Sequence, residues 1–170
     1  PEDYPIDVVS ILLKWIALEF VEERERITST DIAMSYMKEL INRSLIQVKS
    51  TLNDGRLNKC GLHDFLREIL VSKSKEQDFT TVATRYYTRW PEKVRHLAIH
   101  NFTDNPQEFS SLKCLRSVVI FGYEDPLTTT FLSKFLYGGP KLLKVLDLDG
   151  AELDNIPKQV FKLFHLRYLS

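Results

Sequence analysis

Histidine and aspartate are adjacent at His63 and Asp64, where the sequence pattern changes from that of a strand to that of a helix. An imidazole at the start of a helix can contact a phosphate group, helped by free backbone amides and by the helix dipole. Either side chain could equally cap the helix, with the carboxylate accepting a hydrogen bond from a backbone amide. Composition and spacing leave both interpretations open.

The other chemically interesting residues predict no catalytic or metal site. His96 and His100 are four residues apart on a predicted strand and its turn, which separates them by about 13 Å, too far for one ion. Cys60 and Cys114 form no CxxC pair and no disulfide framework, so each is expected to be a buried, reduced thiol. The six glycines form no phosphate loop, and no serine lies in a GxSxG elbow. We therefore expect no enzymatic activity from this chain.

The elements that position the His-Asp pair follow from the apolar periodicity. One helix is predicted with Asp7 as its cap, and a second helix begins at Thr28. Residues 45–49 and 56–62 predict two strands, and the Asn-Asp-Gly sequence at 53–55 predicts the hairpin turn between them. A third helix follows at once. The order helix, helix, strand, turn, strand, helix is that of an α+β winged-helix unit.

A repeated apolar pattern occupies the second half of the chain. Copies of the spacing L-x-x-L-x-L start at Val94, Leu115 and Leu143, and a fourth copy starts at Leu166. Their separations of 21, 28 and 23 residues fall within the range of about 20–29 residues that is typical of leucine-rich repeats. Each coil of such a solenoid buries its apolar face only by stacking on the next coil.

The predicted organisation has three parts. A winged-helix domain spans 1–75, a linker spans 76–92, and the start of an α/β leucine-rich-repeat solenoid spans 93–170. The repeats are expected to bind proteins through exposed strand positions. These positions are Arg95, His96, Ala98, Arg116, Ser117, Val119, Lys144, Val145 and Asp147.

Charge and hydropathy exclude several classes of protein. The 170 residues include 23 basic and 23 acidic side chains and are 44% hydrophobic, which is typical of a soluble globular protein. This balance argues against a nucleic-acid partner. The longest apolar stretch, 8–21, is interrupted by charges and too short to span a bilayer, so no transmembrane segment is expected. The chain begins with Pro1 rather than Met, which suggests a longer protein.

Two alternative functions remain at this point. The first is a winged-helix DNA-binding regulator, whose recognition helix would span about 30–43. Charges in that helix cancel, which disfavours a duplex partner. The second alternative is a leucine-rich-repeat interaction module without any switch activity.

Several motifs resemble plant nucleotide-binding leucine-rich-repeat (NLR, NB-ARC) disease-resistance proteins. The motifs of the winged-helix part are PEDY at 1–4, LKWIA at 13–17, FV at 20–21 and YMKELINRSLI at 36–46. The sequences LKCLRS at 112–117 and VLDL at 145–148 resemble the early repeats of the family. Leu62-His63-Asp64 corresponds to the Met-His-Asp motif of that family, with Leu in place of Met. One departure is Leu18-Glu19, where the family usually has Glu-Gly.

The resemblance implies a cytoplasmic receptor of plant innate immunity that is switched by ADP and ATP. His63 would contact the β-phosphate of ADP in the full-length protein, and Asp64 would support the backbone of the motif. Leu62 preserves the volume and polarity of the family's Met. The partners implied are an upstream nucleotide-binding domain in cis, and a pathogen effector or guarded host protein that the repeats recognise. Because that domain lies upstream, we expect the isolated chain to bind neither nucleotide.

Overall fold

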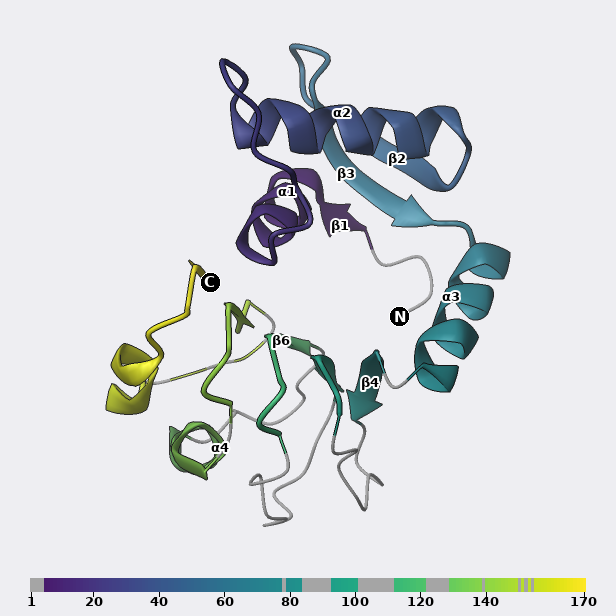
Figure 1. Cartoon of the computed structure of the whole chain (residues 1–170). Coiled ribbons are helices and arrows are strands. Elements are labelled where there is room, and N and C mark those ends of the chain that lie inside the picture. The colour runs from purple at the N-terminus through teal and green to yellow at the C-terminus, as the bar shows by residue number, and fades with distance from the viewer. Residues whose placement is uncertain are drawn as a thin grey trace. The chain divides into compact units, whose positions relative to one another are not determined.

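The computed structural model describes residues 5–77, 79–83, 93–100, 112–121, 129–138, 140–149, 151, 153 and 155–170 (Figure 1). The chain divides into two compact units, Pro1–Ser72 and Lys73–Ser170. The boundary falls inside a helix, three residues before the predicted end of the winged-helix domain at 75.

The first unit contains three helices and a three-stranded antiparallel sheet. Its elements are β1 (Ile6–Asp7), α1 (Val8–Ala17), α2 (Ser29–Asn42), β2 (Ile46–Thr51), β3 (Leu57–Leu62) and α3 (Asp64–Glu76), the last of which continues into the second unit. The order of strands in the sheet is β1-β3-β2. This arrangement confirms the predicted winged helix and adds one short strand, β1, that was not predicted from the sequence.

Side-chain caps determine where α1 and α2 begin. The Ser10 amide donates a hydrogen bond of 2.8 Å to the Asp7 carboxylate, and the Asp31 amide donates one of 3.1 Å to the Thr28 hydroxyl. The same hydroxyl donates to the Asp31 carboxylate at 2.6 Å. Both caps are predicted from the sequence, because short polar side chains satisfy backbone amides that a helix leaves free at its start.

Helix α1 ends in a Schellman motif. The Glu19 amide donates to the Ile16 carbonyl at 3.0 Å, and the Phe20 amide donates to the Trp15 carbonyl at 2.9 Å. This geometry requires a left-handed residue, and Glu19 has a φ of 62°. Glu19 is also the position at which the resembled family has glycine, the residue that adopts this φ at the least cost. Helix α2 ends in the same way at Ser44, with a φ of 57°.

The hairpin between β2 and β3 turns at the predicted place. Gly55 has a φ of 81°, and the Leu52 amide donates to the Arg56 carbonyl at 2.8 Å to close the turn. The Asp54 carboxylate accepts hydrogen bonds from the backbone and the side chain of Arg56, which together hold the pKa of Asp54 below its usual value. An irregularity in register near Ser50 bends β2.

One apolar cluster holds the first unit together. Its buried members come from α1, α2, the loop between them and the sheet, and they are Val8, Leu12, Val21, Ile32, Ala33, Met37, Ile46 and Cys60. Burial raises the pKa of the Cys60 thiol, and the charge of Asp7 adds to this effect. Cys60 is therefore the buried thiol that was expected. For Cys114 the expectation is wrong, because its side chain is exposed between the inward-facing Leu112 and Leu115.

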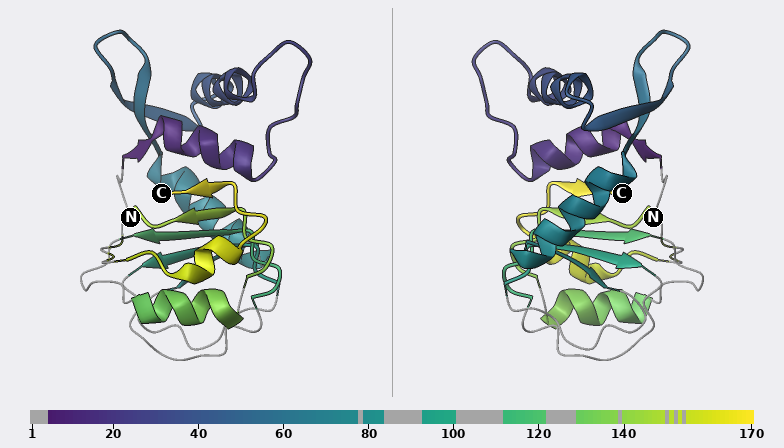
Figure 2. Two further views of the ribbon diagram at one scale, coloured as in Figure 1. Left: turned by 90° about the vertical axis from the view of Figure 1, so that its left-hand side faces the viewer. Right: turned by 90° about the vertical axis from the view of Figure 1, so that its right-hand side faces the viewer.

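The second unit is built on a parallel sheet. Its strands are β4 (Thr80–Ala83), β5 (His96–His100), β6 (Ser117–Phe121), β7 (Val145–Asp147) and β8 (Tyr168–Leu169), and they lie side by side in chain order. The helices α4 (Thr129–Gly138) and η2 (Lys158–Lys162) lie on one side of this sheet (Figure 2). Helix α4 was not predicted from the sequence.

Strand β4 lies within the range for which a linker was predicted, 76–92. It pairs in parallel with β5, from Thr80 opposite His96 to Ala83 opposite Ile99. Ala83 is fully buried in the core of the second unit. Residues 80–83 are therefore the first strand of the sheet, because their side chains add to its apolar face. Most of the remaining linker range lies outside the described residues.

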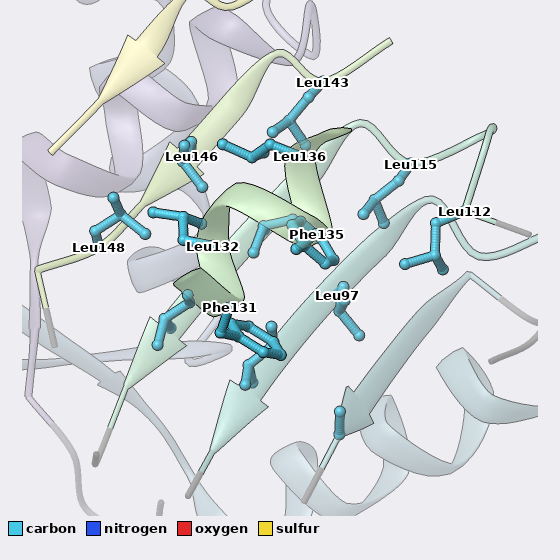
Figure 3. Close-up of a cluster of buried hydrophobic side chains, with 14 of the residues drawn as sticks. Leu97, Leu112, Leu115, Phe131, Leu132, Phe135, Leu136, Leu143, Leu146 and Leu148 are labelled. Atoms are coloured by element: carbon cyan, nitrogen blue, oxygen red, sulfur yellow. The ribbon is translucent and has the colours of Figure 1, made fainter. Parts of the chain in front are cut away.

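The core of the second unit repeats from strand to strand. The register places Leu97 beside Val118, and Val118 beside Leu146, so that apolar side chains of β5, β6 and β7 stack in one row. Helix α4 covers this row (Figure 3). Its buried side chains are Phe131, Leu132, Phe135 and Leu136. The rings of Phe131 and Phe135 stack with their centroids 6.2 Å apart.

Three strand positions expected to be exposed are buried instead, namely Ser117, Val145 and Asp147. Neighbouring strands supply hydrogen-bond partners for the two polar ones. The Ser117 hydroxyl is 2.8 Å from Nδ1 of His96, and the Asp147 carboxylate accepts from the Ser170 hydroxyl at 2.8 Å. Satisfied polar groups can be buried at small cost. The predicted exposure is therefore wrong for these positions.

Candidate functional site

The predicted motif lies where β3 ends and α3 begins. Leu62 is the last residue of β3, opposite Ile46 of β2, and packs partly buried against the core of the first unit. His63 follows it, and Asp64 is the first residue of α3. The side chains of His63 and Asp64 are both exposed. A residue anchored in the core is thus followed directly by two polar side chains that a ligand or another domain can reach.

The backbone places His63 at the cap position of α3. The Arg67 amide donates a hydrogen bond of 2.9 Å to the His63 carbonyl, which is the first bond of the helix. The amides of the first turn have no acceptor within the helix, and the dipole gives this end a partial positive charge. An exposed imidazole beside such amides has the chemistry that favours an anion. The Asp64 carboxylate would repel an anion, which suits it to supporting the backbone rather than to direct contact.

A further cation near this junction was not predicted from the sequence. The side chain of Lys49 lies across Gly61, and a Cβ atom added to Gly61 would be 3.1 Å from Cε of Lys49. Strands β2 and β3 bring the two residues together, because Gln47 is paired with Gly61. Gly61 lies two residues before His63. Only the pairing register reveals this approach, since Lys49 and Gly61 are twelve residues apart in the sequence.

A second histidine contacts a serine in the second unit. Nδ1 of His96 is 2.8 Å from the Ser117 hydroxyl, and the ring lies 4.5 Å from that of Phe79. Burial, together with the charges of Arg116 and Arg95, lowers the pKa of His96 to about 4. A base with such a low pKa is weak at neutral pH, and the buried hydroxyl is inaccessible to a substrate. The pair therefore acts as a structural bridge between β5 and β6.

The remaining features of the described residues, among them one open pocket, do not involve His63 or Asp64. His96 and His100 both lie on β5, which extends the strand over the residue expected in the turn, and the described part of the chain contains no group of three or more potential metal ligands. An open pocket of about 470 Å³ lies at the ends of α1 and α2. Its lining includes Trp15 and Phe20, but neither His63 nor Asp64. Within the described ranges, no helix has the length and apolar character needed to cross a membrane.

The three-stranded sheet, the hairpin wing and the three helices define the first unit as a winged-helix domain. Residues 1–70 match the family model described as the Disease resistance protein Winged helix domain. Together with the curated relatives that match the whole chain, this match shows that the chain belongs to the family of plant disease resistance proteins. The motif at 62–64 thus lies in the kind of domain for which the sequence resemblance predicted it.

Curated relatives match the whole chain. Probable disease resistance protein RXW24L from Arabidopsis thaliana is 33% identical over 180 residues, which is all of this chain and 20% of the relative. Disease resistance protein RPP13 from the same plant is 32% identical over 172 residues, with the same coverage. Putative late blight resistance protein homolog R1B-23 from Solanum demissum is 29% identical over 184 residues, 99% of this chain and 14% of the relative. The chain spans a fifth or less of the length of these relatives.

Proposed function

We propose that this chain contributes the winged-helix part of an intracellular plant immune receptor, and that it responds to ADP or ATP held by another domain of the same polypeptide. The observation that supports this function is the exposed His63 at the start of α3 in a winged-helix domain of this family. An exposed imidazole beside free helical amides is suited to a phosphate.

Each residue of the motif would have a separate task. Leu62 fixes the end of β3 to the core, so that the motif moves with the winged helix as one body. The His63 ring would donate a hydrogen bond to a phosphate oxygen of ADP and so favour the resting arrangement. Asp64 would hold the motif's backbone and a neighbouring loop in place. ADP supplies the negative charge that this site accepts, and the upstream nucleotide-binding domain would supply most of the binding contacts.

The energy needed from such a contact is small. A receptor that exchanges between a resting and an active arrangement responds to any ligand that favours one of them. A contribution of about 1.4 kcal/mol from one contact shifts that equilibrium tenfold. A single histidine at the edge of a shared site is therefore sufficient to influence the switch, although it is insufficient to bind the nucleotide alone.

The second unit would form the start of a leucine-rich-repeat solenoid. Support comes from its five parallel strands in chain order and from the row of apolar side chains that continues from β5 to β7. This is how repeats that bury their faces on one another are arranged. We propose that the repeats restrain the winged helix in the resting receptor. They would also take part in recognising an effector or a guarded host protein in the cytoplasm.

Variants of the full-length receptor test the switch. Replacing Asp64 with Val is expected to loosen the resting arrangement and to cause cell death in leaf tissue without an effector. Replacing His63 with Ala is expected to reduce the amount of ADP that copurifies with the receptor. Asp54→Val is a matched control, because Asp54 is an exposed carboxylate of the same domain at the tip of the hairpin. A silent Asp64→Val receptor with normal ADP content would refute the proposal.

A separate measurement tests where the nucleotide is held. Titration calorimetry of the 170-residue chain with ADP is expected to show no measurable heat of binding. Micromolar binding by this chain alone would contradict the assignment of the main nucleotide contacts to an upstream domain. It would leave the role of His63 to be decided by the variants above.

A further inference from the structure

Basic side chains occupy the same position in four successive strands of the second unit. Arg95 directly precedes β5, Arg116 precedes β6, Lys144 precedes β7 and Arg167 precedes β8. Because these strands are parallel, their starts lie at one end of the sheet (Figure 2). We call Arg95, Arg116, Lys144 and Arg167 the basic row.

The backbone joins the members of the basic row directly, in one geometry that repeats. The amides of Arg116 and of the residue after it both donate to the Arg95 carbonyl, at 2.7 and 3.1 Å. The amides of Lys144 and of the next residue donate in the same way to the Arg116 carbonyl, at 2.8 and 3.1 Å. Those of Arg167 and of the next residue donate to the Lys144 carbonyl, at 2.8 and 3.0 Å. The repeated backbone therefore sets the members about 4.8 Å apart and directs their side chains to one face.

The side chains of the basic row reach solvent. The residue before each of Arg95, Arg116 and Lys144 is buried in the core, whereas Arg95 and Arg116 are exposed and Lys144 is half-buried. Strands β5 and β6 have a paired strand on both sides, so the exposure of Arg95 and Arg116 does not depend on the last strand of the sheet. A coil stacked after β8 would lengthen the row rather than cover it, because coils stack along the direction in which the strands pair.

Positive charge predominates in the segments that carry these four strands. The described segments are 93–100, 112–121, 140–149 and 163–170. They contain seven lysines and arginines but two aspartates, although basic and acidic residues balance over the whole chain. Asp147 is buried, and Asp149 lies after the end of β7. The charge at the starts of the strands is therefore mainly positive.

The two arginines of β5 and β6 lie close together and are not neutralised by the fold. Burial lowers the pKa of His96, and the charges of Arg116 and Arg95 add to this effect, which places both guanidinium groups near one ring. Within the described residues, no ion pair joins Arg95 or Arg116 to an acidic side chain. Like charges on neighbouring strands destabilise a sheet. A row of them is therefore suited to a ligand of opposite charge rather than to the stability of the fold.

We propose that the basic row binds an acidic segment of a partner protein, which lies across the strands. This inference deepens the recognition role proposed above for the repeats, and it rests on that proposal. A guanidinium group binds a carboxylate through two parallel hydrogen bonds. The row spans about 14 Å, which is the length of about four extended residues, so one segment can present several carboxylates to it.

A nucleic-acid partner fits this row less well. Nucleic-acid affinity depends on neutralising many phosphates, whereas the chain has no net charge and the row offers four cations. His96 and Tyr168 follow members of the row, and their rings are half-buried. They offer little stacking surface to a base.

Fluorescence anisotropy with the 170-residue chain tests the proposal. The probe is a labelled peptide of about ten residues in which Glu and Ser alternate, and the control peptide has Gln in place of Glu. The chain is expected to bind the Glu peptide at least about ten times more tightly than the Gln peptide. Raising the salt concentration from about 0.05 M to about 0.5 M should remove most of this difference, because the arginines act through screened charges.

Matched variants separate the basic row from general attraction to positive charge. The double variant Arg95→Gln and Arg116→Gln should bind the Glu peptide about tenfold more weakly, because each exposed ion pair contributes a few-fold. The double variant Arg95→Lys and Arg116→Lys should lose less, since it keeps the charge without the planar fork. Lys158→Gln and Lys162→Gln remove the same charge from the exposed surface of η2 and should bind like the unaltered chain. Circular dichroism of each variant checks that the fold is retained.

Four results would overturn the proposal. The first is equal binding of the two peptides, or binding of neither. The second is a loss in the Lys158→Gln and Lys162→Gln variant as large as that in the Arg95→Gln and Arg116→Gln variant. The third is a single-stranded oligonucleotide that binds more tightly than the Glu peptide and displaces it. The fourth is a full-length receptor that does not bind the Glu peptide although the 170-residue chain does, because an acidic segment of the receptor itself would then occupy the row.

These outcomes are independent of the nucleotide switch. The peptide measurements on the 170-residue chain need no ADP, and the variants of His63 and Asp64 leave the basic row unchanged. Loss of peptide binding with a normal response of the His63 and Asp64 variants would refute the basic row alone. The opposite combination would refute the switch alone.

Discussion

Two histidines of this chain show how their surroundings determine what an imidazole can do. His63 is exposed at a helix start, where its ring remains available to a ligand. His96 lies between β4 and β6, where the Ser117 hydroxyl and the Phe79 ring contact it. Both residues are visible in the sequence as polar groups near element boundaries. Their difference in exposure arises only when neighbouring strands pair.

The buried position of His96 predicts a stability that depends on pH. Because the pKa of His96 falls to about 4 in the folded chain, the unfolded chain binds more protons between about pH 4 and 6.5. The free energy of unfolding should therefore decrease as the pH falls through this range. The loss should be on the order of 1 kcal/mol, since the ring is partly exposed and solvent screens its charge. Urea denaturation at pH 7 and at pH 4.5 measures it.

A variant isolates the contribution of His96 from that of the carboxylates. Replacing His96 with Gln should reduce the difference between the two pH values, whereas replacing the exposed His165 with Gln should leave it unchanged. If both variants show the same pH dependence as the unaltered chain, folding does not lower the pKa of His96.

Among the elements, helix starts are predicted better than helix ends. The caps at Asp7 and Thr28 follow from the sequence, because each depends on a side chain and an amide three residues away. The ends at Glu19 and Ser44 have no glycine to mark them. Their left-handed conformation is imposed by the Schellman hydrogen bonds of α1 and α2. Side-chain caps that the sequence shows therefore specify where these helices begin, whereas backbone hydrogen bonds without a marker residue specify where they end.

The left-handed Glu19 at the end of α1 gives an element-scale prediction. Replacing Glu19 with Gly should raise the free energy of unfolding of the first unit by about 0.5–1 kcal/mol. A side chain in this conformation costs roughly 1–2 kcal/mol, and the greater freedom of glycine in the unfolded chain offsets part of the gain. Thermal denaturation followed by circular dichroism would detect the increase as a higher melting temperature.

A second glutamate of the same loop provides the control. Glu23 is also exposed but lies outside the left-handed region, so Glu23→Gly should leave stability unchanged or reduce it slightly. If Glu19→Gly lowers the melting temperature by as much as Glu23→Gly, the backbone conformation at Glu19 is not a source of strain.

The features that were not predicted from the sequence depend on contacts between residues that are far apart in the chain. Strand β4 has no apolar repeat of its own, and its role as the first strand depends on parallel pairing with β5. Helix α4 has its buried residues at helical spacing, but it lies in the 28-residue interval between the repeat starts at Leu115 and Leu143, where the repeat pattern marks only the strands. Lys49 approaches Gly61 only because of the hairpin register. Local periodicity and turn chemistry predict the winged helix, whereas these contacts require the folded sheet.

For the whole molecule, the main consequence of the fold is that the chain has two cores. The cluster around Met37 and the cluster around Leu146 have no residue in common. Helix α3 connects the two units, since it begins in the first and ends in the second. A ligand at the start of this helix therefore acts on the element that joins two independently packed bodies.

Separate cores predict that destabilisation stays within one unit. Leu146→Ala removes a fully buried side chain of β7, and Met37→Ala removes one of α2, and each should cost about 2–5 kcal/mol. Hydrogen exchange with mass spectrometry should show faster exchange in β5, β6 and β7 for Leu146→Ala, with α1 and α2 unchanged. Met37→Ala should give the opposite pattern. If either substitution accelerates exchange equally in both units, their cores unfold as one cooperative body. A ligand that bound at His63 would then affect the sheet through the global stability of the chain rather than through α3.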